Sequence, residues 1–227
     1  MARLYHFALD PFCRRIRLML AEYGETPELV ASPPWQPDAA LFDFTPPAEM
    51  PLLVDDDGAT AAGALAAGEY LLETRGAKKN LTGATAAQRA EARRLSAFFD
   101  GRMYMDATRP VLMEKVLRRK LPREQGGGAP DTRRLRAAVQ RVAAYLEVID
   151  RLAEQRGLLA GDELTLADLA AAAHLSALEY LDALNWGDFA TAKVWYQRIK
   201  SRPAFRPLLT DRVAGVAPAA VYSQLDF

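Results

Sequence analysis

The spacing of apolar residues changes once along the chain, near residue 77. Before that point, short apolar runs alternate with turn residues and short amphipathic stretches, which predicts strands and helices in alternation. After it, apolar residues recur at helical spacing. A chain of 227 residues is long enough for two such parts, each with its own core. We therefore expect an α/β domain over residues 1–77, an all-helical domain over residues 85–213 and a C-terminal extension over residues 214–227.

The first part predicts a small sheet with helices packed on it. Its strands are expected at residues 3–8, 28–31, 50–54 and 59–61, and its helices at residues 11–23, 38–42 and 63–75. In the second part we expect helices at residues 85–120, 131–156, 165–184, 189–200 and 203–209. Pro110 predicts a kink or break in the first of these, because proline lacks an N–H group and its ring clashes with the preceding turn.

The formal net charge of zero conceals an uneven distribution. Residues 1–76 carry 5 Lys and Arg against 12 Asp and Glu, whereas residues 77–227 carry 24 against 17. Most of the basic excess lies in residues 78–141, with 16 basic and 6 acidic side chains. This excess favours an acidic partner. The alternative is that these residues only form the solvated faces of helices.

Composition excludes several classes of protein. Half the residues are apolar, which indicates a folded chain rather than a disordered one. No apolar run is long enough to cross a bilayer, and the N-terminus lacks the residue order of a signal peptide, so we expect a cytoplasmic protein. One cysteine allows no internal disulfide. His6 and His174 are expected in the core, so we expect no metal site.

A strand-like run leads through Pro11 into an amphipathic helix. Anions and thiolates are favoured at such a helix N-terminus, because its backbone N–H groups are free and the helix dipole is positive there. Cys13 lies in the first turn beside Arg14 and Arg15, and these features predict a lowered thiol pKa. The alternative is that Cys13 is a small residue packed under the first strand.

Four local patterns occur in an order and spacing that cover nearly the whole chain. They are Pro11–Arg17 after the first strand, Met50-Pro51 before a later strand, Thr165–Leu169 before an alanine-rich helix, and Trp195–Arg198 followed by Arg202–Phe205. Together they resemble the glutathione S-transferase family. The resemblance implies a thioredoxin-like N-terminal domain, a cis peptide bond at Met50-Pro51 and an all-helical C-terminal domain.

The residue that would stabilise the glutathione thiolate is replaced. Serine- and cysteine-type relatives carry this residue directly before the proline that is Pro11 here, and the chain has Asp10 at that position. A carboxylate cannot donate a hydrogen bond to the sulfur, and its charge raises the thiol pKa. We therefore expect Asp10 to cap the first helix rather than to act in catalysis.

The residues that would bind the γ-glutamyl group are also missing. The family pattern has a Glu-Ser pair between an Asp-Gly pair and a Glu-Tyr-Leu run. Asp57-Gly58 and Glu69–Leu71 match it in register, but the Glu-Ser positions are occupied by Gly63-Ala64. The resemblance therefore implies a degenerate site without a glutathione cofactor, whose remaining catalytic candidates are Asp10 and Cys13.

Within the family, the chain most resembles a non-catalytic alphaproteobacterial group whose members localise with FtsZ. Members of this group are dimers that bind the tubulin-like division protein FtsZ, and they are associated with filament bundling, filament curvature and regulation of constriction. The resemblance implies a homodimer, formed through the helices beginning near Gly63 and Thr85, that acts at the division site. Candidate partner-binding residues are Trp35, Arg118, Arg119, Lys120, Arg123, Leu225, Asp226 and Phe227.

Alternatives remain open at this point. The chain is either such a regulator, a glutathione-dependent transferase or thiol reductase that uses the turn from Asp10 to Cys13, or a binding module for another acidic protein. Trp35 is either an anchor for a partner or a residue packed at the domain interface. The tail, residues 222–227, either docks on its own helical domain or is presented to a partner. We expect no nucleic-acid partner.

Overall fold

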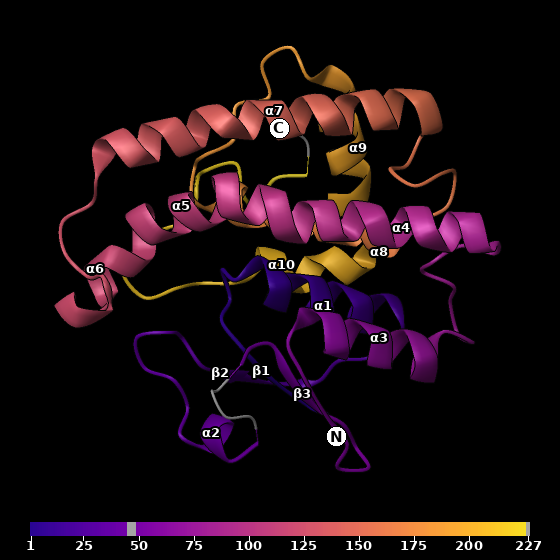
Figure 1. Cartoon of the computed structure of the whole chain (residues 1–227), viewed down its shortest axis with the longest axis horizontal. Helices are drawn as coiled ribbons and strands as arrows, with labels where there is room; N and C mark the ends of the chain where they lie inside the picture. Colours follow the sequence, from indigo (N-terminus) through magenta and orange to yellow (C-terminus); the bar gives the residue numbers. More distant parts are fainter. Residues whose placement is uncertain (45–48, 226–227) are drawn as a thin grey trace.

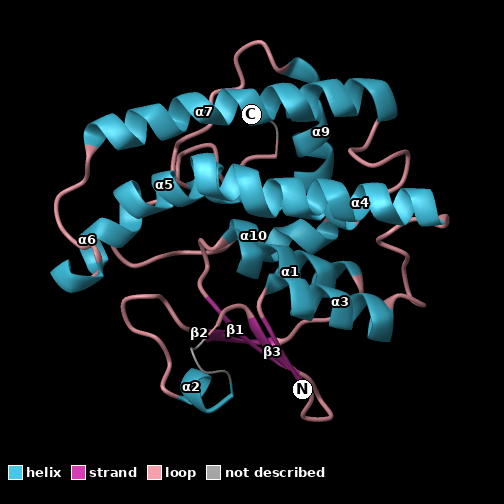
Figure 2. Ribbon diagram, in the orientation of Figure 1, coloured by secondary structure: helices cyan, strands magenta, loops and turns pink. Residues whose placement is uncertain are grey.

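The computed structural model describes residues 1–44 and 49–225 (Figure 1). The N-terminal part is a thioredoxin-like domain with a small mixed sheet, and helices make up the rest of the chain (Figure 2). The N-terminal elements are β1 (Arg3–His6), α1 (Pro11–Glu22), β2 (Glu28–Ala31), α2 (Ala40–Phe44), β3 (Leu52–Val54), β4 (Thr60–Ala62) and α3 (Ala64–Arg75). This is the predicted order of strands and helices.

The sheet has the strand order β2-β1-β3-β4. β1 and β2 are parallel because α1 connects them, whereas β3 is antiparallel to both β1 and β4. Side chains alternate between the two faces of the sheet. Leu4 and Leu53 therefore belong to the main core beside α1 and α3, while Tyr5 and Leu52 form a second, small core against Leu41 of α2.

The second part is helical from residue 86 onward. Its helices are α4 (Ala86–Phe98), η1 (Phe99–Thr108), α5 (Arg109–Leu112), η2 (Met113–Leu117), α6 (Arg118–Lys120), η3 (Arg123–Gln125), α7 (Thr132–Arg156), α8 (Leu166–Tyr180), α9 (Ala190–Lys200), η4 (Pro203–Phe205) and α10 (Arg206–Leu209). In Figure 1, α1 and α3 lie between the sheet and the long rod that starts at α4, and α7 lies on the far side of that rod.

Pro110, which predicts a kink or break, does not interrupt the helix but is flanked by π-helical turns. The chain stays helical from Ala86 to Lys120, and η1 and η2, on either side of α5, are π-helical. The N–H group of Arg109 bonds to the carbonyl oxygen of Tyr104, five residues earlier. These wider turns accommodate the proline ring, which would meet the carbonyl four residues earlier in a regular α-helix.

Helix α8 lies at the centre of the helical part, and every one of its residues is buried. Its small alanine side chains allow α1 and α4 to pack closely against it. The predicted N-terminal cap is present. The Asp168 carboxylate accepts hydrogen bonds from the Thr165 backbone N–H at 3.0 Å and from the Trp195 indole N–H at 3.0 Å. The capping motif thus also anchors α9.

Candidate functional site

The turn between β1 and α1 contains Asp10, which caps α1 as predicted. Its backbone is extended, and its Oδ1 atom accepts a hydrogen bond from the Cys13 N–H at 2.8 Å. Burial raises the pKa of the Asp10 carboxyl, against the hydrogen bond from Cys13. The carboxylate therefore occupies the helix N-terminus that would otherwise favour an external anion.

The prediction that Cys13 has a lowered pKa is wrong. The side chain is fully buried, and its Sγ atom accepts from the Phe7 N–H at 3.5 Å. Burial, with the neighbouring Asp10 carboxyl as a second cause, raises the thiol pKa well above its ordinary value. A buried neutral thiol is a poor nucleophile, so the geometry agrees with the alternative of a small packed residue.

Arg14 does not face the thiol but connects α1 to distant parts of the chain. Its Nε atom donates to the Ala8 carbonyl oxygen at 2.6 Å. Its Nη1 atom donates to the hydroxyls of Ser176 and Tyr222, each at 2.9 Å. Its Nη2 atom lies 3.3 Å from Oδ2 of Asp211. One buried guanidinium therefore joins the opening turn, the central helix α8 and the C-terminal segment.

Arg17, one helical turn further along, completes this network. It lies on the same face of α1 as Arg14 and forms a two-pronged ion pair with Asp211, at 2.8 and 2.9 Å. Sequence reasoning missed these internal roles. The available signal was the spacing of the two arginines, since residues three apart share a helix face, on a helix expected to be covered by a second domain.

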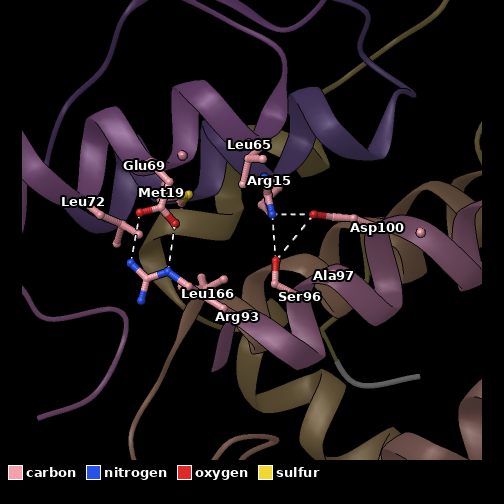
Figure 3. A pocket seen from close by; sticks show the side chains of 12 residues that line it. Arg15, Met19, Leu65, Glu69, Leu72, Arg93, Ser96, Ala97, Asp100 and Leu166 are labelled. Atoms are coloured by element: carbon pink, nitrogen blue, oxygen red, sulfur yellow. Dashed lines mark hydrogen bonds and ion pairs between the residues drawn. The ribbon is translucent and has the colours of Figure 1, made fainter. Parts of the chain in front are cut away.

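Arg15 points to the opposite side, toward α3 and α4 (Figure 3). Its Nη1 atom donates to the Ser96 hydroxyl at 2.7 Å and pairs with the Asp100 carboxylate. Its Nη2 atom donates to the carbonyl oxygen of Ala64 at 2.6 Å. Beside it lies a cavity of about 400 Å³, lined mainly by apolar residues and bordered by an ion pair between Glu69 and Arg93 at 2.9 Å.

The N-terminus of α3, where the family carries its Glu-Ser pair, is closed by the chain itself. Gly63 has a φ of +78°, a conformation that favours glycine. A Cβ atom added to it would lie 2.4 Å from Oε1 of Glu49. The carbonyl oxygen of the next residue, Ala64, accepts a hydrogen bond from Arg15. The preceding Met50-Pro51 peptide bond is cis, as expected.

Trp35 is partly buried at the boundary between the two parts of the chain. Its ring packs edge-on against Phe7, with ring centroids 5.3 Å apart. From the other side, Nζ of Lys120 lies 5.8 Å from the ring centroid. One part of the ring therefore packs at the domain interface while another part stays accessible, and the structure brings Trp35 and Lys120 together.

The four candidate basic residues near α6 divide into two pairs. Their position before a glycine-rich loop predicts that all four are exposed, and Arg119 and Arg123 are. Arg118 and Lys120 are only partly exposed, because both have internal partners. Arg118 donates to the Ala129 carbonyl oxygen at 2.9 Å and pairs with Glu114 at 3.1 Å, and Lys120 covers the Trp35 ring.

The tail contains both a docked residue and an exposed one. Tyr222 is fully buried, and its hydroxyl donates to the Leu208 carbonyl oxygen at 2.7 Å while accepting from Arg14. Leu225 is 38% exposed. The remaining candidates, Asp226 and Phe227, lie outside the described residues. The chain is therefore anchored at Tyr222, and the accessible tail begins after it.

The two histidines are core residues. Nδ1 of His174 lies 2.9 Å from the Thr108 hydroxyl, and burial, followed by the charge of Arg17, lowers the pKa of His6 to about 4. Within residues 1–44 and 49–225, no group of three or more His, Cys, Asp or Glu side chains is placed to hold a metal ion. No helix in the described part of the chain is long and apolar enough to span a membrane.

Comparison with known proteins agrees with this architecture. Residues 11–74 match the model of the glutathione S-transferase N-terminal domain, and residues 108–203 match that of its C-terminal domain. The chain is 38% identical, over 99% of its length and 97% of the relative's, to FtsZ-localized protein A of Caulobacter vibrioides.

Solved structures of similar proteins cover the entire chain. The structure of FzlA from C. crescentus superposes with a TM-score of 0.92 at 38% identity, over 100% of this chain and 99% of that one. A glutathione S-transferase from Sinorhizobium meliloti 1021 superposes with a TM-score of 0.94 at 43% identity, over 100% of both chains. Both similarities span the thioredoxin-like part and the helical part.

Proposed function

This chain belongs to the glutathione S-transferase family, and from that premise we propose that it is a non-enzymatic member that binds FtsZ filaments in the cytoplasm at the division site. There it promotes bundling or curvature of the filaments and regulates constriction. The observation that carries the proposal is the full-length similarity to FtsZ-localized protein A, at 38% identity. Because the fold alone does not establish a function, the geometry around Asp10, Cys13 and Gly63, where the family binds glutathione, is the second consideration.

The geometry of that site supports a role without thiol chemistry. Cys13 is fully buried with a raised pKa, and Asp10 occupies the helix N-terminus. At α3, Glu49 fills the space beside Gly63. A glutathione molecule would therefore meet neither a thiolate donor nor a free γ-glutamyl pocket, and this argues against the transferase and reductase alternatives.

The partner surface that we propose combines the exposed basic residues near α6, the partly exposed Trp35 and the accessible tail. Arg119 and Arg123 supply positive charge for an acidic partner. Lys120 lies between Trp35 and the C-terminal segment, since its Nζ atom covers the Trp35 ring and would lie 3.1 Å from a Cβ atom added to Gly215. Tryptophan and arginine are enriched at binding hot spots.

We further propose that the protein acts as a homodimer formed through α3 and α4. Leu65 on α3 is 77% exposed and Met105 on η1 is 55% exposed. Leu65 also lines the cavity between α1, α3 and α4, where a second copy would bury it. A dimer carries two partner surfaces, and two linked surfaces can cross-link neighbouring filaments.

Co-sedimentation with GTP-assembled FtsZ filaments tests the proposal. We expect pelleting that weakens with salt, and at least a five-fold loss of affinity, roughly 1 kcal/mol, in Trp35→Ala and in a chain ending at Tyr222. This truncation keeps Tyr222, because its removal would disturb the core. The control is Arg151→Glu on α7, whose exposed side chain forms an ion pair with Glu147 one helical turn away.

Other outcomes favour the alternatives. No pelleting with FtsZ, combined with capture of another acidic protein, favours a binding module with a different client. Strong retention on glutathione resin, with a transferase activity that Cys13→Ala abolishes, contradicts the proposal and favours the enzyme.

A further inference from the structure

A groove of about 340 Å³ lies between α7 and the stretch that comprises η1, α5 and η2. It belongs to the side of the helical part that faces away from the sheet, where α5 and the first half of α7 run next to each other (Figure 1). It contains neither the turn at Asp10 nor Trp35 nor the tail. The groove is therefore separate from every site described above.

The walls of the groove combine positive charge with apolar surface. Arg109 contributes from one side, and Arg134 and Arg141 contribute from α7 on the other. Between them lie Pro110 and Met113, together with alanines of α7. Such a surface offers charge-assisted hydrogen bonds to carboxylates and a contact area for apolar side chains.

The three arginines are only weakly engaged by the protein. All three are exposed, and the guanidinium group of Arg109 has no hydrogen bond or ion pair with any residue in the described part of the chain. Arg141 lies 3.9 Å from Asp106, and Arg134 lies 3.5 Å from Asp131. Exposed ion pairs at such distances contribute little, so a partner can replace them at small cost.

The acidic residues that line the groove are engaged elsewhere. Glu114 is buried, where it accepts from the Asp131 N–H at 2.7 Å and pairs with Arg118. Asp106 accepts from the Tyr145 hydroxyl at 2.7 Å. Residues 102–141 contain 11 basic and 4 acidic side chains, so the potential around the groove remains positive.

We propose that this groove binds a short acidic segment of a protein partner. Carboxylates of the segment pair with Arg109, Arg134 and Arg141, and an apolar side chain of the segment packs on Pro110 and Met113. The inference deepens the proposed function, on which it rests for the existence of an acidic partner, by adding a second contact surface away from the tail.

A protein segment fits the groove better than a nucleic acid does. Single-stranded nucleic acids are held by stacking on aromatic side chains and by an unbroken basic track. None of the described residues that line the groove is aromatic, and two of them, Asp106 and Glu114, are acidic. Such acidic positions interrupt a basic track, whereas an apolar side chain of a protein segment matches the surface formed by Pro110 and Met113.

The first experiment measures fluorescence anisotropy of the full-length protein with a labelled synthetic peptide of alternating Glu and Leu. The matched control peptide replaces every Glu by Gln. We expect the Glu peptide to bind, and its affinity to fall when salt is raised from about 50 mM to about 200 mM, since ions screen exposed charges. Equal binding of the Gln peptide would overturn the inference.

The second experiment tests the location. The double variant Arg134→Glu/Arg141→Glu turns two attractions into repulsions, so we expect the affinity for the Glu peptide to fall at least about ten-fold. The control variant Arg151→Glu/Arg198→Glu, which makes the same charge change at two exposed positions outside the groove, is expected to stay within about two-fold. Equal losses in both variants would assign the binding to overall charge, and no loss in either would exclude the groove.

Two further arms separate this inference from the proposed function. The first arm adds single-stranded oligodeoxythymidine at the same concentration of negative charges as the peptide. If it displaces the peptide from the groove, the specificity for a protein segment is refuted. In FtsZ co-sedimentation, the double variant is expected to weaken pelleting. Pelleting unchanged in the double variant contradicts the groove while leaving the proposed function intact. Peptide binding at the groove without FtsZ pelleting leaves the groove in place and contradicts the proposed function.

Discussion

Two groups of arginines show how the same side chain serves opposite purposes in this protein. In α1, Arg14, Arg15 and Arg17 are buried, and each is engaged by carboxylates, hydroxyls or carbonyl oxygens from other parts of the chain. Around the groove, Arg134 and Arg141 are exposed and held by ion pairs of 3.5 and 3.9 Å. The first group holds the molecule together, and the second remains available to a partner.

The difference also explains why the Cys13 thiol, at the turn between β1 and α1, is not activated. Two arginines directly follow Cys13 in sequence, but their guanidinium groups point away to distant partners, and the thiol is left with burial and the Asp10 carboxylate. Positive charge near a cysteine in sequence does not lower its pKa when the charge is engaged elsewhere. The buried group is therefore structural, whereas the exposed group is accessible for the binding that we propose.

The largest expected effect concerns the reactivity of Cys13. Because the thiol is fully buried, a thiol-specific reagent reaches it only when the protein opens. We expect labelling in the native protein at pH 8 to be at least about 10³-fold slower than in denaturant, given ordinary domain stabilities. A spectrophotometric thiol assay measures both rates. Fast labelling of the native protein would indicate a reactive thiol and would contradict the structural assignment.

Replacing Arg14 by Met tests the buried group directly. The change removes one partner of a buried ion pair and leaves the Ala8 carbonyl and two hydroxyls without their donor. We expect the free energy of unfolding to fall by about 3–5 kcal/mol, measured in guanidinium chloride. The matched control is Arg136→Met on the exposed face of α7. A loss below about 1 kcal/mol for Arg14→Met would show that the two groups do not differ.

The buried group also predicts a pH dependence through His6. Its folded pKa of about 4 lies below the ordinary value of 6.5, because the imidazole is buried near Arg17. Between about pH 4 and pH 6.5, His6 is therefore protonated in the unfolded chain but not in the folded protein. Stability is complete above about pH 6.5 and falls as the pH drops, by up to about 3 kcal/mol below pH 4. Denaturation of His6→Gln at several pH values should lack this contribution, and an identical slope would exclude it.

A smaller effect is expected for Tyr222→Phe. The change keeps the ring, which packs against Tyr180, but removes the hydroxyl that donates to Leu208 and accepts from Arg14. Loss of a buried hydrogen-bonding group costs about 1–3 kcal/mol. Thermal unfolding measures this loss, and limited proteolysis should show earlier cleavage of the C-terminal segment. Unchanged cleavage would indicate that the hydroxyl does not hold the segment.

The smallest effect is expected in the exposed group. Arg134→Gln and Arg141→Gln remove only loose surface ion pairs, so each should change the free energy of unfolding by less than about 0.5 kcal/mol. Circular dichroism during thermal unfolding provides the measurement. Losses comparable to that of Arg14→Met would mean that these side chains are structural, and the contrast between the groups would disappear.

Much of the fold follows from local patterns in the sequence. Two helix starts could be predicted from capping residues, which depend only on a few neighbours in the sequence. These residues are Asp10 before Pro11 and Thr165 before an alanine-rich helix. The cis bond at Met50-Pro51 was also expected. A distortion at Pro110 was expected as a kink or break, but its form, π-helical turns in a continuous helix, was not, because such turns depend on the packing of a whole helix.

The candidate site was less accessible to sequence reasoning. The replacement of the Glu-Ser pair by Gly63-Ala64 is visible in the sequence, but the approach of Glu49 to that position is not. The partners of Arg118 and Lys120 were missed for the same reason, since Ala129 and Trp35 are brought to them only by folding. Side-chain direction cannot be inferred from proximity in sequence.

By itself, the sequence determined the order of strands and helices and the helix caps, because each of these depends on residue type within a short stretch. Tertiary structure alone decided which charges are used internally and which remain exposed. Arg14 and Arg134 are the same residue type on helices of similar pattern. They differ because α1 lies between the sheet and α8, where a buried charge must find partners, whereas Arg134 faces solvent, where water already satisfies it.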